Sequence, residues 1–259
     1  MMALDAETAR MIAESVAGHA RGPAPAEPVA ALHAQGWLTC ALPEEAGGLG
    51  FGVDAAALIA GGLARACRAE PVAATYLATR LLALAAPGSS PIQALAEGRL
   101  VSLAPGAVRA DSGRLSGTLW QVPPAELHLV LAGEALFALP GTAAEQLRVD
   151  GHPRGTRVLE ATQAEALAEG PAVSAALRQV LAEGRLVVGA ELLAHAEVMQ
   201  DITLEHLRTR RQFGQSLGQF QALQHKAVDL YSATLMGRAV LDTAITRAAE
   251  GLAPDDLDR

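Results

Sequence analysis

Apolar residues recur at helical spacing through most of the first hundred positions of the chain. One such segment runs from residue 5 to 19 and ends where three prolines stand within residues 21–28. A short helix is expected at 29–35, and a longer helical segment runs from 53 to about 86 with one break at a Glu-Pro pair. The sequence PGSSP at 87–91 then marks a turn. This part of the chain predicts a group of helices.

Between residues 100 and 159 the pattern changes to short apolar runs separated by glycine, proline and aspartate. Runs of this kind are typical of β-strands, so we expect a small β domain here. Helical spacing then returns. One long helix is expected to begin at Ser174 or Ala182 and to end at Arg210, and another is expected at 219–250.

Apolar positions cover more than one side of the first of these late helices, with Val188 and Leu192 on one side and Leu193 on another. A helix of this kind belongs inside a bundle. The expected fold class is therefore α+β and mostly α. It comprises an N-terminal helical domain at 1–98, a small β-barrel-like middle domain at 99–170 and an incomplete C-terminal helical bundle at 171–259.

Composition and charge exclude several classes of protein. With 259 residues and 51% hydrophobic content, the chain is long and apolar enough to bury a core. A formal net charge of −8 argues against a general nucleic-acid binder, because binding phosphates needs clustered Lys and Arg. No apolar run reaches the roughly 18 to 20 residues that span a bilayer, and the N-terminus lacks the pattern of a signal peptide.

Cysteine usage indicates a reducing compartment. Cys40 and Cys67 have neither a CxxC nor a metal-like spacing, so we expect two reduced thiols, a cytoplasmic location and no metal site.

A basic and aromatic segment, RTRRQFGQSLGQFQALQH at 208–225, interrupts the helical pattern of an otherwise acidic chain. The planar, permanently charged fork of arginine suits phosphate oxygens, so one interpretation is an anion site. The alternative is a helix hairpin whose arginines are solvated and whose Phe213 lies in the core. Gly214 is expected to end the first helix.

Two motifs within this order of domains resemble the acyl-CoA dehydrogenase family of flavoproteins. The first corresponds to the GW...PEE.GG.G element of the family and comprises Gly36-Trp37, Pro43-Glu44-Glu45 and Gly47-Gly48-Leu49-Gly50. The second corresponds to the R.QFG......FQ..QH turn of the family and comprises Arg210 to Gly214, Phe220-Gln221 and His225. The resemblance extends over nearly the whole chain.

The resemblance implies roles for these residues in holding FAD. In the family, this turn reaches the FAD of a neighbouring subunit. Arg210 would then meet the pyrophosphate, and Gln212, Phe213 and Gln221 would lie around the adenosine. Trp120 resembles the tryptophan that flanks the flavin ring, although a buried aromatic residue of a β domain is an equally ordinary interpretation.

The resemblance also implies a role in substrate binding for one residue. Arg185 stands where the family has an arginine near the CoA thioester. The alternative is a charge near a helix N-terminus that pairs with Glu183 or Glu191.

The sequence departs from the family at the catalytic base. Family chemistry removes an α-proton from an acyl thioester while a hydride leaves the β-carbon for the flavin, and it needs a carboxylate. Most members carry this glutamate late in the chain, in a region that this sequence does not contain. A minority carry it just before the CoA arginine, where this chain has Gly184. Glu183 is one position away, about 100° around a helix.

The β domain departs from the family as well. A Thr-Glu-Pro stretch that helps to hold the flavin corresponds here to Leu103-Ala104-Pro105-Gly106. Gln121 and Val122 follow Trp120 where serine or threonine is usual.

These observations favour a flavoprotein chain that catalyses α,β-dehydrogenation of an acyl-CoA thioester with FAD, as a subunit that needs a partner for its catalytic base. The expected partners are the acyl-CoA, a complete acyl-CoA dehydrogenase chain in a homo- or hetero-oligomer, and an electron-acceptor flavoprotein. The alternative is an inactive scaffold or regulatory partner of such an enzyme. A third interpretation is a truncated gene product.

Overall fold

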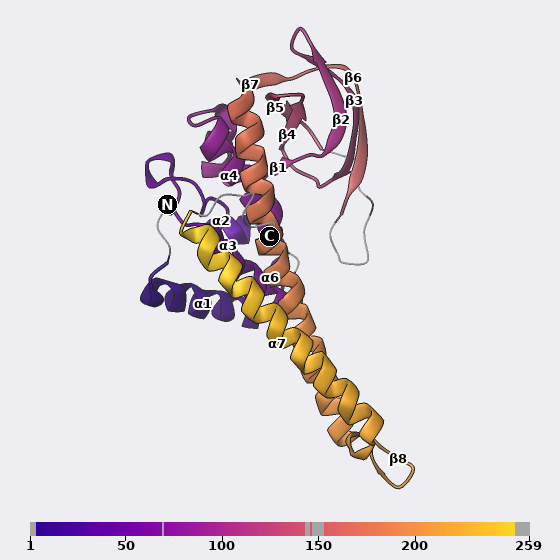
Figure 1. Ribbon diagram of the computed structural model, residues 1–259. Coiled ribbons are helices and arrows are strands. Elements are labelled where there is room, and N and C mark those ends of the chain that lie inside the picture. The colour runs from indigo at the N-terminus through magenta and orange to yellow at the C-terminus, as the bar shows by residue number, and fades with distance from the viewer. Residues whose placement is uncertain (1–3, 69, 143–145, 147–152, 252–259) are drawn as a thin grey trace.

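The computed structural model describes residues 4–68, 70–142, 146 and 153–251, and places a β region between two groups of helices (Figure 1). The first group consists of α1 (Ala6–Arg21), α2 (Pro28–Ala34), the 3-10 helix η1 (Glu44–Ala46), α3 (Val53–Arg65), α4 (Val72–Ala85) and α5 (Ser90–Ala96). The last group consists of α6 (Pro171–Thr209), the 3-10 helix η2 (Leu217–Gln219) and α7 (Gln221–Ala249). The fold is mostly helical, as the sequence predicts.

Two sheets that face each other form the β region. The strands are β1 (Val101–Leu103), β2 (Gly106–Asp111), β3 (Arg114–Val122), β4 (Leu127–Ala132), β5 (Ala135–Pro140), β6 (Gly155–Gln163) and β7 (Glu165–Glu169). One sheet has the order β1-β4-β5-β7 and the other β2-β3-β6. Leu115 and Leu119 of β3 share a buried cluster with Val130 and Leu139 of the other sheet. Within the described strands the two sheets do not close into a barrel, so the expected barrel-like form is corrected to a two-sheet arrangement.

The long helix α6 begins earlier than the sequence indicated. It starts at Pro171, which occupies the first turn, where a missing N–H costs nothing. With 39 residues it is about 58 Å long, and its first half packs against α3 and α4. Close packing depends on small residues. A Cβ at Gly61 of α3 would lie in van der Waals contact, 3.4 Å, with the carbonyl oxygen of Ala190, so the two helix backbones are close there.

Toward its C-terminal end, α6 extends away from the β region and the first group of helices, and α7 runs alongside it (Figure 1). Among the described residues, α7 contains no buried side chain. The two helices pair as expected, but the face that should lie inside a bundle is uncovered. Its exposed apolar residues include Leu192, Met199 and Ile202 of α6 and Val228, Tyr231, Leu235, Met236 and Val240 of α7. No described helix combines the length and the apolar character needed to cross a membrane.

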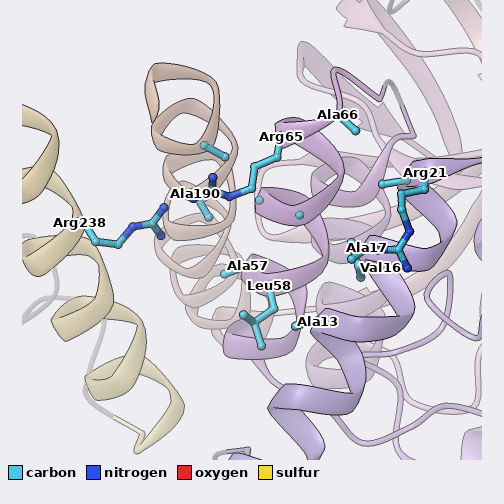
Figure 2. A pocket seen from close by; sticks show the side chains of 14 residues that line it. Ala13, Val16, Ala17, Arg21, Ala57, Leu58, Arg65, Ala66, Ala190 and Arg238 are labelled. Carbon is cyan, nitrogen blue, oxygen red and sulfur yellow. The ribbon is translucent and has the colours of Figure 1, made fainter. Parts of the chain in front are cut away.

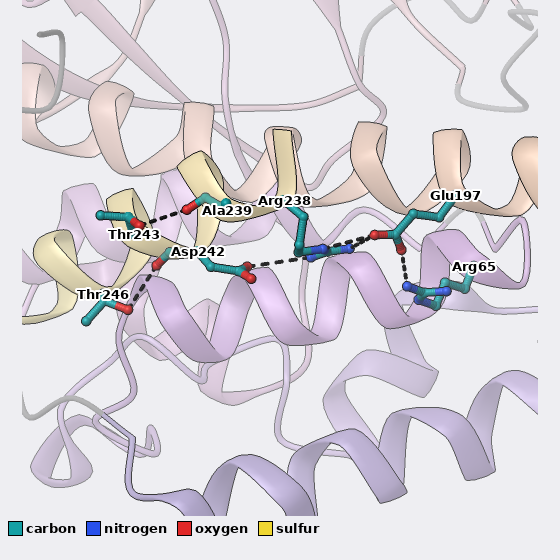
Figure 3. A network of polar contacts seen from close by, with 7 residues as sticks. All are labelled: Arg65, Glu197, Arg238, Ala239, Asp242, Thr243 and Thr246. Atoms are coloured by element: carbon teal, nitrogen blue, oxygen red, sulfur yellow. Dashed lines mark hydrogen bonds and ion pairs between the residues drawn. The ribbon is translucent and has the colours of Figure 1, made fainter. Parts of the chain in front are cut away.

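A charged network joins α7 to the rest of the molecule (Figure 3). Glu197 of α6 accepts hydrogen bonds from Arg238 of α7 at 3.0 Å (Nε) and 2.6 Å (Nη2), and it also pairs with Arg65 of α3. Arg238 lies 3.7 Å from Asp242 on its own helix. One carboxylate therefore connects three helices where α6 leaves the helical core.

The GW...PEE.GG.G segment folds as a tight turn within the first group of helices. Gly47 and Gly50 have φ angles of 79° and 66°, as expected for positions that glycine favours. Gly48 serves a different purpose, because a Cβ there would lie 2.1 Å from the carbonyl oxygen of Leu42. Its N–H donates to the carbonyl of Pro43 at 3.1 Å. The motif is a structural element in this chain.

Candidate functional site

The basic segment between α6 and α7 forms a β-hairpin at the far end of the two helices (Figure 1). β8 (Arg211–Gln212) pairs antiparallel with β9 (Gln215–Ser216). The two residues between them, Phe213 and Gly214, have φ angles of 53° and 83°. Two successive positive φ values are the requirement of a tight two-residue hairpin. The prediction that Gly214 ends the first helix is therefore wrong, because that helix already ends at Thr209.

Phe213 lies at the tip of this hairpin. Its side chain is 88% exposed, so the alternative interpretation that placed Phe213 in the core is wrong. A positive φ is uncommon for a bulky residue and carries strain. Its ring contacts Phe220 edge to face, with centroids 6.2 Å apart. The fold therefore exposes an apolar ring at the cost of backbone strain, which is a combination that favours contact with another molecule.

The two neighbouring arginines differ in their surroundings. Arg211 donates from Nη2 to the carbonyl oxygen of Gly214 at 3.4 Å, so its side chain folds back onto the hairpin. Arg210 caps α6 through its N–H, which donates to His206 at 2.9 Å. Within the described residues, the guanidinium of Arg210 has no hydrogen bond or ion pair. Its fork is available to an outside anion.

The amide side chains expected at the site flank the same tip. Gln212 lies in β8, and Gln221 begins α7; both are exposed. Exposed amides, a free guanidinium and an exposed aromatic ring are the groups that would bind phosphate oxygens and a planar heterocycle. The residues at the tip therefore fit the pyrophosphate and adenosine of FAD.

Trp120 lies in the β region, at the opposite end of the molecule from the hairpin (Figure 1). The pairing of β3 with β6 shifts register between Leu119 and Val122, and Gln121 within this bulge has a φ of 51°. A bulge of this kind re-aims a side chain. Trp120 is 46% exposed, so it is not the buried aromatic of the alternative interpretation. Its backbone N–H donates to the carbonyl oxygen of Pro105 at 2.9 Å. This bond joins the stretch around Trp120 to the Leu103–Gly106 stretch, the two segments whose sequences were compared with the flavin-binding segments of the family.

Arg185 lies on the exposed surface of α6, well inside the helix. The alternative that placed it near a helix N-terminus is therefore wrong. At a rise of about 1.5 Å per residue, Thr209 at the end of α6 is about 36 Å further along the helix. Within one chain, Arg185 and Trp120 therefore lie far from the hairpin tip. A single cofactor can contact both groups only if they come from different chains.

Glu183 is buried between α4 and α6, and its side chain is only 6% exposed. Its carboxylate accepts hydrogen bonds from Tyr76 at 2.6 Å, Arg80 at 3.0 Å and Gln179 at 2.8 Å. Desolvation, and then the charge of Glu183, raise the pKa of the Tyr76 hydroxyl. Sequence patterns did not identify this network. The only signal was the charge of Arg80 inside an apolar helix, since a buried charge needs a partner.

At the position where a minority of the family carries the catalytic glutamate, a neighbouring side chain fills the space that a longer residue would need. Gly184 is buried, and a Cβ added to it would lie 2.4 Å from a terminal methyl group of Leu77 in α4. A carboxylate side chain there would require Leu77 to move. Together with the structural role of Glu183, this leaves no free carboxylate at or next to that position.

Comparisons with known proteins agree with this architecture. Residues 3–92 match the acyl-CoA dehydrogenase N-terminal domain, and residues 173–257 match the acyl-CoA dehydrogenase C-terminal domain. Acyl-CoA dehydrogenase IpdE2 of Mycobacterium tuberculosis is 29% identical over 211 residues, which cover 78% of this chain and 59% of that protein. The chain therefore spans less than two thirds of the length of this curated relative.

Solved structures show the same fold. The Tcur3481-Tcur3483 steroid acyl-CoA dehydrogenase variant has a TM-score of 0.73 and 26% identity, covering 95% of this chain and 77% of that chain. The ChsE4-ChsE5 complex from Mycobacterium tuberculosis has a TM-score of 0.79 and 22% identity, covering 97% of this chain and 80% of that chain. Both terminal regions and the fold lead to one conclusion: the chain belongs to the acyl-CoA dehydrogenase family.

Proposed function

We propose that this chain is an FAD-dependent acyl-CoA dehydrogenase subunit that shares its cofactor and its active site with a partner chain of the same family. The observation that carries the proposal is the position of the hairpin. The free guanidinium of Arg210 and the exposed ring of Phe213 lie at the far end of α6, away from the β region of their own chain. These groups need a cofactor held by another chain.

Each residue of the proposed site has a role that follows from its chemistry. Arg210 donates a pair of hydrogen bonds to the pyrophosphate. Gln212 and Gln221 bind polar atoms of the adenosine, and Phe213 covers its ring. At the other end of the molecule, Trp120 would pack beside the flavin ring of a second cofactor. That ring would supply the hydride-accepting chemistry, and an electron-acceptor flavoprotein would be a further partner.

Substrate binding is assigned to the exposed face of α6. Arg185 lies there and would pair with the CoA part of an acyl thioester. Solved relatives include a steroid acyl-CoA dehydrogenase, so we assign the acyl group to the steroid-derived class. The α-proton is removed by a carboxylate of the partner, because Gly184 replaces the early base and Glu183 is held by three donors.

The second candidate function is an inactive scaffold or regulatory partner of an acyl-CoA dehydrogenase. The packing of Leu77 over Gly184 favours it, since that position is closed to a base. The two functions differ in one property. A scaffold need not bind FAD, whereas a shared active site must.

FAD titration tests the proposal. The chain is co-expressed with a second acyl-CoA dehydrogenase homologue from the same organism, and FAD is added to the purified complex and to variants. Arg210→Lys should weaken FAD binding about tenfold, because an ammonium keeps the charge but loses the paired hydrogen bonds. Arg211→Lys is the matched control and should bind FAD like the parent, since Arg211 already bonds to Gly214. Equal affinities for all three proteins, or no FAD binding by the parent complex, would reject the shared site.

A further inference from the structure

An apolar hollow lies among α1, α3, α6 and α7, away from the proposed cofactor site (Figure 2). Its volume is about 500 Å³, within the range of sites that take small ligands. Ala17 of α1, Ala57 of α3 and Ala190 of α6 are among the residues that line it, and most of the others are also alanine, glycine, valine or leucine. We refer to it as the apolar hollow.

Small side chains explain why this space is empty. Alanine and glycine on the facing surfaces of α1, α3 and α6 allow the helix backbones to pack closely but leave no atoms to fill the space between their exposed sides. At Gly62 of α3, a Cβ would lie 2.5 Å from a methyl group of Val16, so α1 and α3 are as close there as glycine permits. The hollow is therefore a fixed feature of the packing.

The charged groups at the hollow are all of one sign. Arg21, Arg65 and Arg238 line it, and no carboxylate does, in a protein with a formal net charge of −8. Arg65 and Arg238 share the carboxylate of Glu197, and Asp242 lies 3.7 Å from Arg238. Within the described residues, the guanidinium of Arg21 at the end of α1 has no hydrogen bond or ion pair. The rim therefore keeps a positive excess and free donors at Arg21.

The hollow opens on the opposite side of α6 from the proposed CoA arginine. Ala190 and Ala194 line the hollow, whereas Arg185 lies on the exposed face of the same helix. At 100° per residue, these alanines are about 140° and 180° around the helix axis from Arg185. A ligand in the hollow would not compete with an acyl-CoA at Arg185.

We propose that the apolar hollow binds a single-chain anionic amphiphile of the fatty acid class. The hydrocarbon chain lies along the alanines of α1, α3 and α6, where it removes apolar surface from water. The carboxylate pairs with the guanidinium of Arg21, whose donors are free, and adds to the field of Arg65. A hydrocarbon chain suits this lining because most of the residues that form it are apolar.

Binding of cis-parinaric acid, a fluorescent fatty acid, to the purified chain tests this proposal. The parent should bind it saturably, palmitate should displace it, and uncharged hexadecanol should displace it at least tenfold less well. Arg21→Gln should weaken binding about tenfold, because a hydrogen-bonded ion pair is lost. Ala17→Leu should weaken it as well, because the added side chain fills the hollow.

Two matched variants control for general effects on α1. Arg10→Gln removes an exposed arginine of the same helix, and Ala6→Leu enlarges an exposed alanine; neither residue lines the hollow. Both should bind parinarate like the parent, and FAD titration of the complex should be unchanged in all four variants. The proposal is overturned by parinarate binding that is absent, by equal affinity of parent and Arg21→Gln, or by hexadecanol that competes as well as palmitate. It is also overturned if Ala17→Leu disturbs only subunit assembly, which would make the hollow a protein interface.

Discussion

Glu191 of α6 is a carboxyl group that the fold holds in unfavourable surroundings. It lines a small hollow with Arg68, Glu70 and His195, and desolvation by burial raises its pKa to about 7. The ordinary value is 4.5. The folded protein therefore binds a proton at Glu191 more tightly than the unfolded chain does between these two pH values. This group loses its stabilising effect as pH rises through that window.

Glu191→Gln should therefore stabilise the protein at pH 8 by up to about 3 kcal/mol and have a much smaller effect at pH 5. Urea unfolding at the two pH values measures the difference. Glu7→Gln, at an exposed position of α1, is the control and should change little at either pH. A stabilisation by Glu191→Gln that is the same at pH 5 and pH 8 would contradict the assignment of a raised pKa.

Individual residues were predictable from sequence where a motif marks them and not where a distant partner defines them. The RRQFG motif singled out Arg210, and the hairpin geometry agrees that Arg210 and Arg211 differ. The role of Glu183 was not predictable, because its partners Tyr76 and Arg80 lie more than 100 residues away in the sequence. The assigned FAD and CoA roles stay predictions.

At the scale of elements, the turn around Gly48 makes a sharp prediction about stability. Gly48→Ala places a Cβ against the backbone of Leu42, which cannot move without breaking the turn, so it should cost about 3 kcal/mol or more. Gly18→Ala in α1 is the control, because nothing lies within 4 Å of its Cβ position. It should stabilise the helix by about 0.5 to 1 kcal/mol. Denaturant unfolding distinguishes the two, and equal effects would show that Gly48 is not under steric pressure.

The uncovered face of α6 and α7 makes a prediction about association. Exposed apolar side chains on this scale favour contact with a partner. Met236→Glu on α7, at a residue that is 69% exposed, should shift the protein toward smaller species in sedimentation velocity. Met11→Glu on α1, at a residue that is 61% exposed, should leave the distribution unchanged. A parent protein that is monomeric at micromolar concentration would count against the subunit assignment.

Helices were easier to predict from sequence than short strands. Periodicity placed the long helices within a few residues, apart from the start of α6, where PAVSAA has too little contrast between its faces. The β8–β9 hairpin was missed because each strand has two residues and its turn is Phe-Gly rather than the usual Asn-Gly. The arrangement of two sheets was also missed, because register between distant strands leaves no local pattern.

For the whole molecule, the central claim is that one chain carries only part of a dehydrogenase site. The hairpin that carries Arg210 and the β region that carries Trp120 lie at opposite ends of the molecule, and Glu183 is held by hydrogen bonds in the interior. Both features have a simple explanation if two different chains meet around each cofactor.

Dye-linked oxidation of a steroid-derived acyl-CoA, measured on the pure chain and on the complex with the second homologue, tests this claim most directly. We expect no turnover and no retained FAD for the chain alone. For the complex we expect FAD absorbance and turnover, with turnover reduced about tenfold by Arg210→Lys at limiting FAD. Substitution of Glu183 by Gln should change the stability of the chain without removing an acid-base group from the complex. Turnover by the pure chain that is abolished by Glu183→Gln would contradict an active site shared between two chains.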